Sequence, residues 1–182
     1  MKKLLSVLVI LAFAFAMNNT FAQGKNYLGI GANLAIPMGS FGDAAGMGFG
    51  GSASFEMSFT PNITGIVTAG YLKFGGQDFG FFSYDYDAIP IMAGIKYYFT
   101  PATPFYAIGQ IGFQIFNANA SYTGPFGYGF EASGSSTEFG LGLGVGYEVP
   151  VGMSGAIDLT GMFNIVSDLN YVGIRAAYRF GI

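Results

Sequence analysis

The last twelve residues of the chain, Tyr171 to Ile182, alternate strictly along the sequence down to the final position. Successive side chains of a β-strand point to opposite faces, so this period of two predicts a strand with one apolar face. The apolar face carries Val172, Ile174, Ala176, Tyr178, Phe180 and Ile182, and the other carries Tyr171, Gly173, Arg175, Ala177, Arg179 and Gly181. A soluble sheet can show one such stripe. About eight of them after an export signal predict a closed barrel with lipid outside and a polar interior.

The N-terminus predicts that export signal. Lys2 and Lys3 precede an apolar run from Leu4 to Met17, and Thr20-Phe21-Ala22 forms a small-x-small cleavage site. The run is about fourteen residues, shorter than the roughly 20 that a membrane helix needs. We therefore expect a signal peptide over 1–22 and a mature start at Gln23, with an uncleaved N-terminal helix as the alternative.

Composition excludes several classes of function. Residues 23–182 suffice for one domain. The chain contains neither cysteine nor histidine, which removes disulfides, thiolate metal ligands, cysteine nucleophiles and the usual general base. We therefore expect no enzyme activity, no cofactor and no metal site. Without Lys2 and Lys3, five basic residues stand against ten acidic ones, which argues against a nucleic-acid partner.

Apolar alternation predicts eight strands, each long enough to cross a membrane with a tilt. They lie at 27–36, 49–60, 63–74, 88–100, 105–117, 137–149, 153–165 and 171–182. The third strand is ambiguous. If Pro61-Asn62 is a two-residue turn, Thr60 pairs with Ile63, and Lys73 then points inward while Ile66, Leu72 and Phe74 face lipid.

The connections alternate in length, which is an independent indication of topology. Tight turns are expected near 61–62, 101–104 and 150–152, and long Gly- and aromatic-rich loops at 37–48, 75–87 and 118–136. Outer-membrane barrels have short periplasmic turns, longer external loops and both termini in the periplasm. We therefore predict an all-β, eight-stranded antiparallel up-and-down transmembrane β-barrel. The fourth external loop, 166–170, is shorter than the others, so we expect the external mouth of the barrel to be lopsided, lower on that side.

The charged residues on the predicted inner face form a candidate network. They are Glu56, Lys96, Glu148, Asp158, Arg175 and Arg179, with Glu138 and Lys73 near the external rim. A charge facing lipid would cost roughly 2–4 kcal/mol at the midplane. The interior of an eight-stranded barrel is just wide enough for side chains to fill, so we expect a salt-bridged plug that includes a cross-strand pair of Asp158 and Arg179.

Four glycines on the inner face of the sixth strand keep a second possibility open. Gly140, Gly142, Gly144 and Gly146 leave space in the lumen, as a narrow channel for solutes or ions would require. The same space admits bulky side chains from the opposite wall. We expect Lys96, Gln110, Gln114 and Arg175 to fold across it.

The remaining acids lie in the predicted loops with no Lys or Arg beside them: Asp43, Asp78, Asp85, Asp87, Glu131 and Asp168. Asp85-Tyr86-Asp87 is the densest candidate for a divalent cation, but its spacing lacks a calcium-loop signature, so solvated charge is favoured. The aromatic residues of the same loop are either a recognition surface or side chains packed on the loop or the lipid interface. They are Phe79, Phe81, Phe82, Tyr84 and Tyr86.

Several segments carry a family resemblance: GIGANLAIPMGSF at 29–41, the Gly-rich 46–51, GYL at 70–72 and GIKYYF at 94–99. The chain resembles the outer-membrane β-barrel domain family of Gram-negative bacteria, which includes OmpA-like and OmpX-like eight-stranded barrels. The resemblance implies contact with outer-membrane lipid and lipopolysaccharide. It also implies recognition by the barrel-assembly machinery through Tyr178, Phe180 and Ile182, although the family usually ends in an aromatic residue. We expect no peptidoglycan-binding domain after the barrel.

These observations predict a monomeric, non-enzymatic outer-membrane protein that stabilises the envelope and displays loops for recognition or adhesion. A narrow channel is the second hypothesis. A lipid-modifying enzyme is disfavoured because the chain lacks histidine. A soluble lipocalin-like barrel is the structural alternative, but it would bury its apolar side chains and expose its charges.

Overall fold

The computed structural model describes residues 25–76, 78–79, 82–100, 103–123, 129–152 and 155–182, and these are almost entirely β-strand. The expected signal peptide, 1–22, lies outside the described residues. The strands are β1 (Asn26–Pro37), β2 (Gly48–Thr60), β3 (Ile63–Phe74), β4 (Asp78–Phe79), β5 (Phe82–Tyr98), β6 (Phe105–Thr123), β7 (Gly129–Val151), β8 (Gly155–Ile165) and β9 (Tyr171–Gly181), and the helix is α2 (Ser40–Ala44). Within these residues, no helix has the length and hydropathy needed to cross a membrane.

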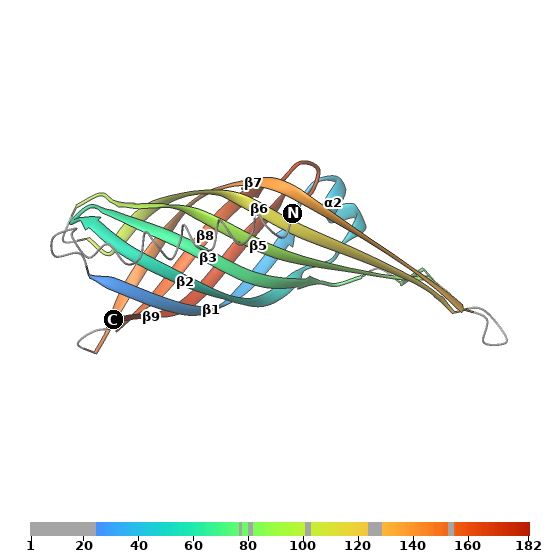
Figure 1. Ribbon diagram of the computed structural model, residues 1–182, viewed down its shortest axis with the longest axis horizontal. Coiled ribbons are helices and arrows are strands. Elements are labelled where there is room, and N and C mark those ends of the chain that lie inside the picture. The colour runs from blue at the N-terminus through green and yellow to red at the C-terminus, as the bar shows by residue number, and fades with distance from the viewer. Residues whose placement is uncertain (1–24, 77, 80–81, 101–102, 124–128, 153–154) are drawn as a thin grey trace, which may run out of the picture.

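The strands close into a barrel. Sequential neighbours pair antiparallel from β1 to β3 and from β5 to β9, while β1 pairs with β9 and β3 pairs with β5 (Figure 1). The two-residue strand β4 adds only a short pairing to β5 outside this ring. The predicted eight-stranded antiparallel up-and-down barrel is therefore confirmed.

Inward and outward side chains alternate as the sequence pattern predicts. In β9, Ile174 and Tyr178 are about half exposed, whereas Arg175 and Ala177 between them are buried. The other strands repeat this pattern, and the exposed set is dominated by Ile, Leu, Val, Phe and Tyr. An apolar outer wall around buried charges is the arrangement of a membrane barrel, and it excludes the lipocalin-like alternative.

The predicted facing of β3 is wrong, and a β-bulge is the reason. Thr60 pairs with Ile63 as expected, but the next pair is Ser58 with Thr64, so Phe59 has no partner. One extra residue in a strand exchanges its two faces. Ile66, Leu72 and Phe74 are consequently buried inside the barrel, and the Lys73 side chain is 62% exposed on the outer surface.

The long loops are shorter than predicted, because their residues continue the strands. β5 begins at Phe82 and β6 runs to Thr123, and β7 begins at Gly129, inside the expected loop 118–136. The β6–β7 hairpin extends far beyond the barrel wall (Figure 1). We call that end of the barrel, which also carries α2, the hairpin end. The opposite end, with the β2–β3 turn and Ile182, is the turn end. The short 166–170 connection beside the hairpin makes the mouth lopsided.

Candidate functional site: the closed barrel interior

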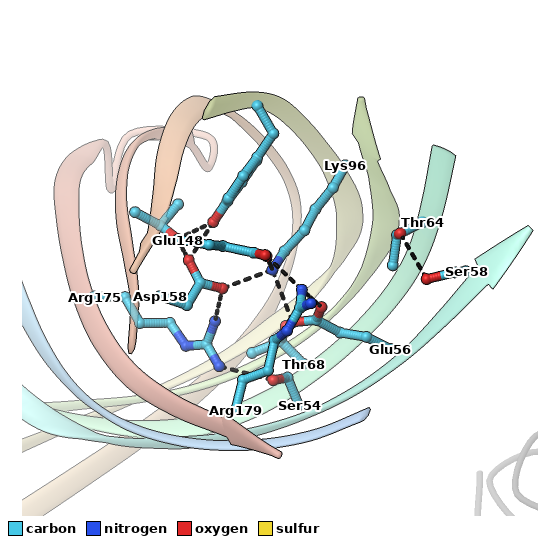
Figure 2. Close-up of polar contacts among 12 residues, drawn as sticks. Ser54, Glu56, Ser58, Thr64, Thr68, Lys96, Glu148, Asp158, Arg175 and Arg179 are labelled. Carbon is cyan, nitrogen blue, oxygen red and sulfur yellow. Dashed lines mark hydrogen bonds and ion pairs between the residues drawn. The ribbon is translucent and has the colours of Figure 1, made fainter. Parts of the chain in front are cut away.

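A cluster of buried charges fills the interior near the turn end. Lys96 of β5, which is completely buried, places its Nζ 2.8 Å from Glu56 Oε1, 3.3 Å from Glu148 Oε1 and 2.6 Å from Asp158 Oδ2. The three carboxylates come from β2, β7 and β8, so one ammonium group joins four strands. Figure 2 shows these side chains converging on the centre of the lumen.

Two arginines of β9 complete the cluster. Arg179 Nη1 lies 3.1 Å from Glu56 Oε2 and donates to Glu148 Oε1. Arg175 Nη1 lies 3.7 Å from Asp158 Oδ2, and its Nη2 donates to Ser54 Oγ at 2.7 Å (Figure 2). We call these six residues the charge cluster: Glu56, Lys96, Glu148, Asp158, Arg175 and Arg179. Its three negative and three positive charges balance, as buried charges require.

Neutral side chains satisfy much of the remaining hydrogen-bonding capacity. Tyr98 donates its hydroxyl to Glu148 Oε1 at 2.6 Å, and Tyr106 donates to Asp158 Oδ1. Thr160 also donates to Asp158 Oδ1, at 3.1 Å. The Lys96 ammonium lies 4.6 Å from the centre of the Tyr106 ring, a distance at which a cation is attracted to the ring face.

The predicted pairing of Asp158 with Arg179 is wrong, although both side chains face inward. Asp158 lies opposite Ala177, so Arg175 and Arg179 occupy its two diagonal positions on β9. Asp158 forms ion pairs with Arg175 and Lys96, while Arg179 forms ion pairs with Glu56 and Glu148. Strand register alone left the two diagonals equivalent, and contacts across the lumen decide between them.

A small chamber lies between the charge cluster and the hairpin end. It has a volume of about 70 Å³, enough for several water molecules. Polar groups from Asn33, Ser52, Gln110 and Arg175 line it together with apolar groups from Ile66, Leu72, Met92, Ile108 and Met162. Gln110 donates to Thr68 at 3.2 Å from the chamber wall. Of the expected lumen-crossing residues, Lys96, Gln110, Gln114 and Arg175 are all buried inside the barrel.

Apolar side chains close the barrel above the chamber. Phe41, from α2 in the connection between β1 and β2, is 3% exposed and packs edge-on against Phe74, Tyr86 and Phe116. The buried members of this aromatic cap are Ala35, Phe41, Ala45, Leu72, Phe74, Ala88, Phe116, Val166 and Tyr171. The sequence pattern does not predict the cap, because only the bulge at Phe59 turns Leu72 and Phe74 inward.

A second set of polar contacts, away from the charge cluster, lies on the outer rim at the hairpin end. Lys73 Nζ lies 3.9 Å from Asp85 Oδ1, and Tyr71 donates to Asp87 Oδ1 at 2.7 Å. The expectation that no base accompanies these loop acids is therefore wrong for Asp85. Within the described residues, no group of three or more His, Cys, Asp or Glu side chains is arranged so that it could hold a metal ion. Glu138 accepts a hydrogen bond from Ser167 at 3.0 Å on the inner side of the rim.

The other predicted positions are placed as follows. Tyr178, Phe180 and Ile182 lie on the outer face at the end of β9, and the Tyr178 and Phe180 rings stack with centroids 6.3 Å apart. Asp43 and Asp168 are exposed in the connections at the hairpin end. The side chains of Asp78, Phe79, Phe82, Tyr84 and Glu131, and Phe81 as a whole, lie outside the described part of the structure.

Solved structures with the same architecture are membrane barrels. The chain is similar to Ail, the attachment invasion locus protein of Yersinia pestis, with 18% identity and a TM-score of 0.64 over 87% of this chain and 99% of that one. A major outer membrane protein from Thermus thermophilus is 17% identical, with a TM-score of 0.58 over 87% of this chain and 99% of that one. Neisserial surface protein A is also 17% identical, with a TM-score of 0.53 over 88% of this chain and 99% of that one. These identities show a shared fold.

Sequence comparison gives the family directly. The search among curated proteins found no match. The model of the outer membrane protein beta-barrel domain matches residues 5–180, nearly the whole chain. The match agrees with the apolar outer wall, the balanced buried charges and the closed ring of eight strands. The chain belongs to the outer membrane protein β-barrel domain family, whose members are integral to the outer membrane.

Proposed function

We propose that this protein is a non-enzymatic surface barrel that binds an extended segment of a partner along the edge of its β6–β7 hairpin. The hairpin end then faces the outside of the cell, and both termini lie in the periplasm. The observation that carries the proposal is that, among the residues the structure describes, one edge of β7 before Leu141 pairs with no other strand; we call it the free edge. β6 pairs with β7 from Gly129 to Tyr147, whereas β8 pairs with it only from Leu141 onward.

The free edge lacks several of the features that normally prevent strand pairing, and its charged residues are Glu131 and Glu138. Within 129–140 there is no proline and no lysine, and the pairing to β6 is continuous, without a bulge. Residues 132–137 are all exposed and consist of Ala, Gly, Ser and Thr. An unpaired row of backbone N–H and C=O groups on such a strand is a template for another strand.

The charge of the hairpin end indicates what kind of partner segment it would bind. The connections and strand ends at the hairpin end carry seven acids, which are Asp43, Asp78, Asp85, Asp87, Glu131, Glu138 and Asp168, and one base, Lys73. This surplus favours a basic segment and disfavours a second copy of the hairpin. A structure of Ail was solved in complex with the heparin analogue sucrose octasulfate. An acidic surface favours a partner of the opposite charge.

The closed interior argues for recognition over transport. The charge cluster and the aromatic cap both lie across the lumen, on either side of the chamber, so a solute would have to displace two packed layers. We infer a monomer surrounded by outer-membrane lipid and lipopolysaccharide, because a closed ring leaves no free edge within the membrane. We also infer that the barrel-assembly machinery reads the end of β9 at Tyr178, Phe180 and Ile182.

The test uses the protein in lipid nanodiscs and the peptide Lys-Thr-Val-Thr-Val-Thr-Lys as the probe. A matched variant lacks residues 118–134 and joins Asn117 to Ser135 through Asn-Gly, which preserves the observed pairing of those two residues. We expect the intact protein to bind the peptide and the shortened hairpin to lose binding at least tenfold. The same peptide with Glu at both ends should bind weakly. Equal binding by both proteins would contradict the proposal.

A further inference from the structure

We propose that the mouth of the barrel is a binding site for a small aromatic molecule carrying a hydrogen-bond acceptor, and that Phe41 occupies this site in the closed state. The site is distinct from the hairpin edge and does not depend on the proposed recognition function. It consists of Phe74, Tyr86, Phe116, Gln114 and Tyr171.

The first observation is that Phe41 packs like a ligand. Its ring is surrounded edge-on by three rings from three strands, with centroid distances of 5.0 Å to Phe74, 6.3 Å to Tyr86 and 6.0 Å to Phe116. Edge-to-face contacts of this kind favour a flat aromatic group over an aliphatic one. The barrel wall supplies this pocket, and a separate connecting segment supplies the ring that fills it.

The second observation is an unused hydrogen-bond donor in the same layer. Gln114 is completely buried, and its Oε1 accepts a hydrogen bond from the Tyr171 hydroxyl at 3.0 Å. Its Nε2 has no partner in the structure. A buried amide left unpaired is costly. An acceptor atom on a bound molecule would satisfy it, and the Phe41 ring has no such atom.

The third observation concerns how the segment with Phe41 is held. Its ends are fixed to the barrel by backbone hydrogen bonds, from Met38 N to Asn170 O at 2.9 Å and from Gly46 N to Gly75 O at 2.8 Å. Between them, Gly39 has a φ of 60°, a conformation that glycine adopts without strain. In this stretch only Phe41 and Ala45 are buried. The ring can therefore leave while both anchors stay in place.

The chamber below the cap defines the depth of the site. It is lined by Leu72 and Tyr171, which also belong to the cap, so the two spaces adjoin. The methionines Met92 and Met162 on its wall can adapt their shape to a substituent. The charge cluster forms its floor on the side of the turn end. The proposed ligand is consequently a one-ring molecule and not a lipid chain.

The test measures binding of acetophenone to the protein in nanodiscs by calorimetry, with empty nanodiscs subtracted. α-Methylstyrene is the matched probe, because it replaces the carbonyl oxygen with a CH₂ group. Phe41→Ala removes the competing ring, and Phe139→Ala, on the lipid face, removes an equal ring without opening the mouth. We expect F41A to bind acetophenone at least tenfold tighter than the native protein and F139A. Phe41→Leu should fall between them.

The role of Gln114 is tested in the same way. F41A should prefer acetophenone to α-methylstyrene by roughly tenfold, and the double variant F41A/Q114M should lose that preference. Binding of both probes to F41A no better than to F139A would overturn the proposal. A preference that survives Gln114→Met would overturn the assigned role of the amide. Heat-modifiable migration on a gel checks that each variant has formed the barrel.

Discussion

Lys96 Nζ lies 2.6 Å from Asp158 Oδ2 while it also contacts Glu56 and Glu148, so one fully buried ammonium group contacts carboxylates from three other strands. Neighbouring strands of a barrel are joined by backbone hydrogen bonds. Lys96 instead connects walls that do not touch, across the lumen. The charge cluster therefore links opposite walls of the barrel across the lumen, a direction in which the sheet forms no backbone hydrogen bonds.

Lys96→Met is expected to destabilise the barrel by about 3–5 kcal/mol, because removing one partner leaves buried charges uncompensated. Lys73→Met is the matched control: its ion pair with Asp85 spans 3.9 Å at an exposed site and should contribute between about 0 and 1 kcal/mol. Urea unfolding in detergent, followed by gel mobility, measures both. Equal effects of the two variants would show that the cluster does not act as inferred.

The barrel could be predicted from the sequence, but the contacts in its interior could not. Alternation of residues such as Ile174 and Arg175 predicted the faces of the strands other than β3 correctly, because lipid tolerates almost no exposed charge. The bulge at Phe59 was not predictable, since no glycine or proline marks it, and the error reversed one strand. The partners of Asp158 depended on contacts across the lumen, which strand-by-strand pairing does not contain. The pocket for Phe41 was not predictable either, because it depends on the bulge, which turns Phe74 inward, and on where the connection between β1 and β2 places Phe41.

Deleting Phe59 tests the consequence of the bulge. A chain that kept Phe59 but paired without the bulge would turn Lys73 into the lumen and Leu72 and Phe74 toward lipid. Deleting Phe59 instead lets Thr60 follow Ser58 directly, so the observed pairs of Ser58 with Thr64 and of Thr60 with Ile63 form a regular ladder. We therefore expect the deletion variant to form a heat-modifiable barrel in which Lys73 still reacts with an impermeant amine reagent, and Phe59→Ala, which retains the extra residue, should also fold normally. A deletion variant that forms no barrel, or whose Lys73 is protected from the reagent, would contradict this assignment of the bulge.

The acidic hairpin end predicts which ligands this protein does not bind. Sucrose octasulfate, which is highly anionic, should give no calorimetric signal with the native protein in zwitterionic nanodiscs at physiological salt. Asp85→Lys together with Asp87→Lys should produce measurable binding that falls as salt increases. Tight binding by the native protein would contradict the charge argument and weaken the case for a basic partner.

The last prediction concerns conduction through the two closed layers of the lumen. The native protein in planar bilayers should show no sustained current, because the charge cluster and the aromatic cap each lie across the lumen. F41A alone opens only the mouth and should stay silent. Arg179→Gln alone disturbs only the charge cluster and should give brief, small steps at most. The double variant F41A/R179Q should show more frequent openings than either single variant. Stable single-channel currents from the native protein would instead favour the narrow channel as the function of this barrel.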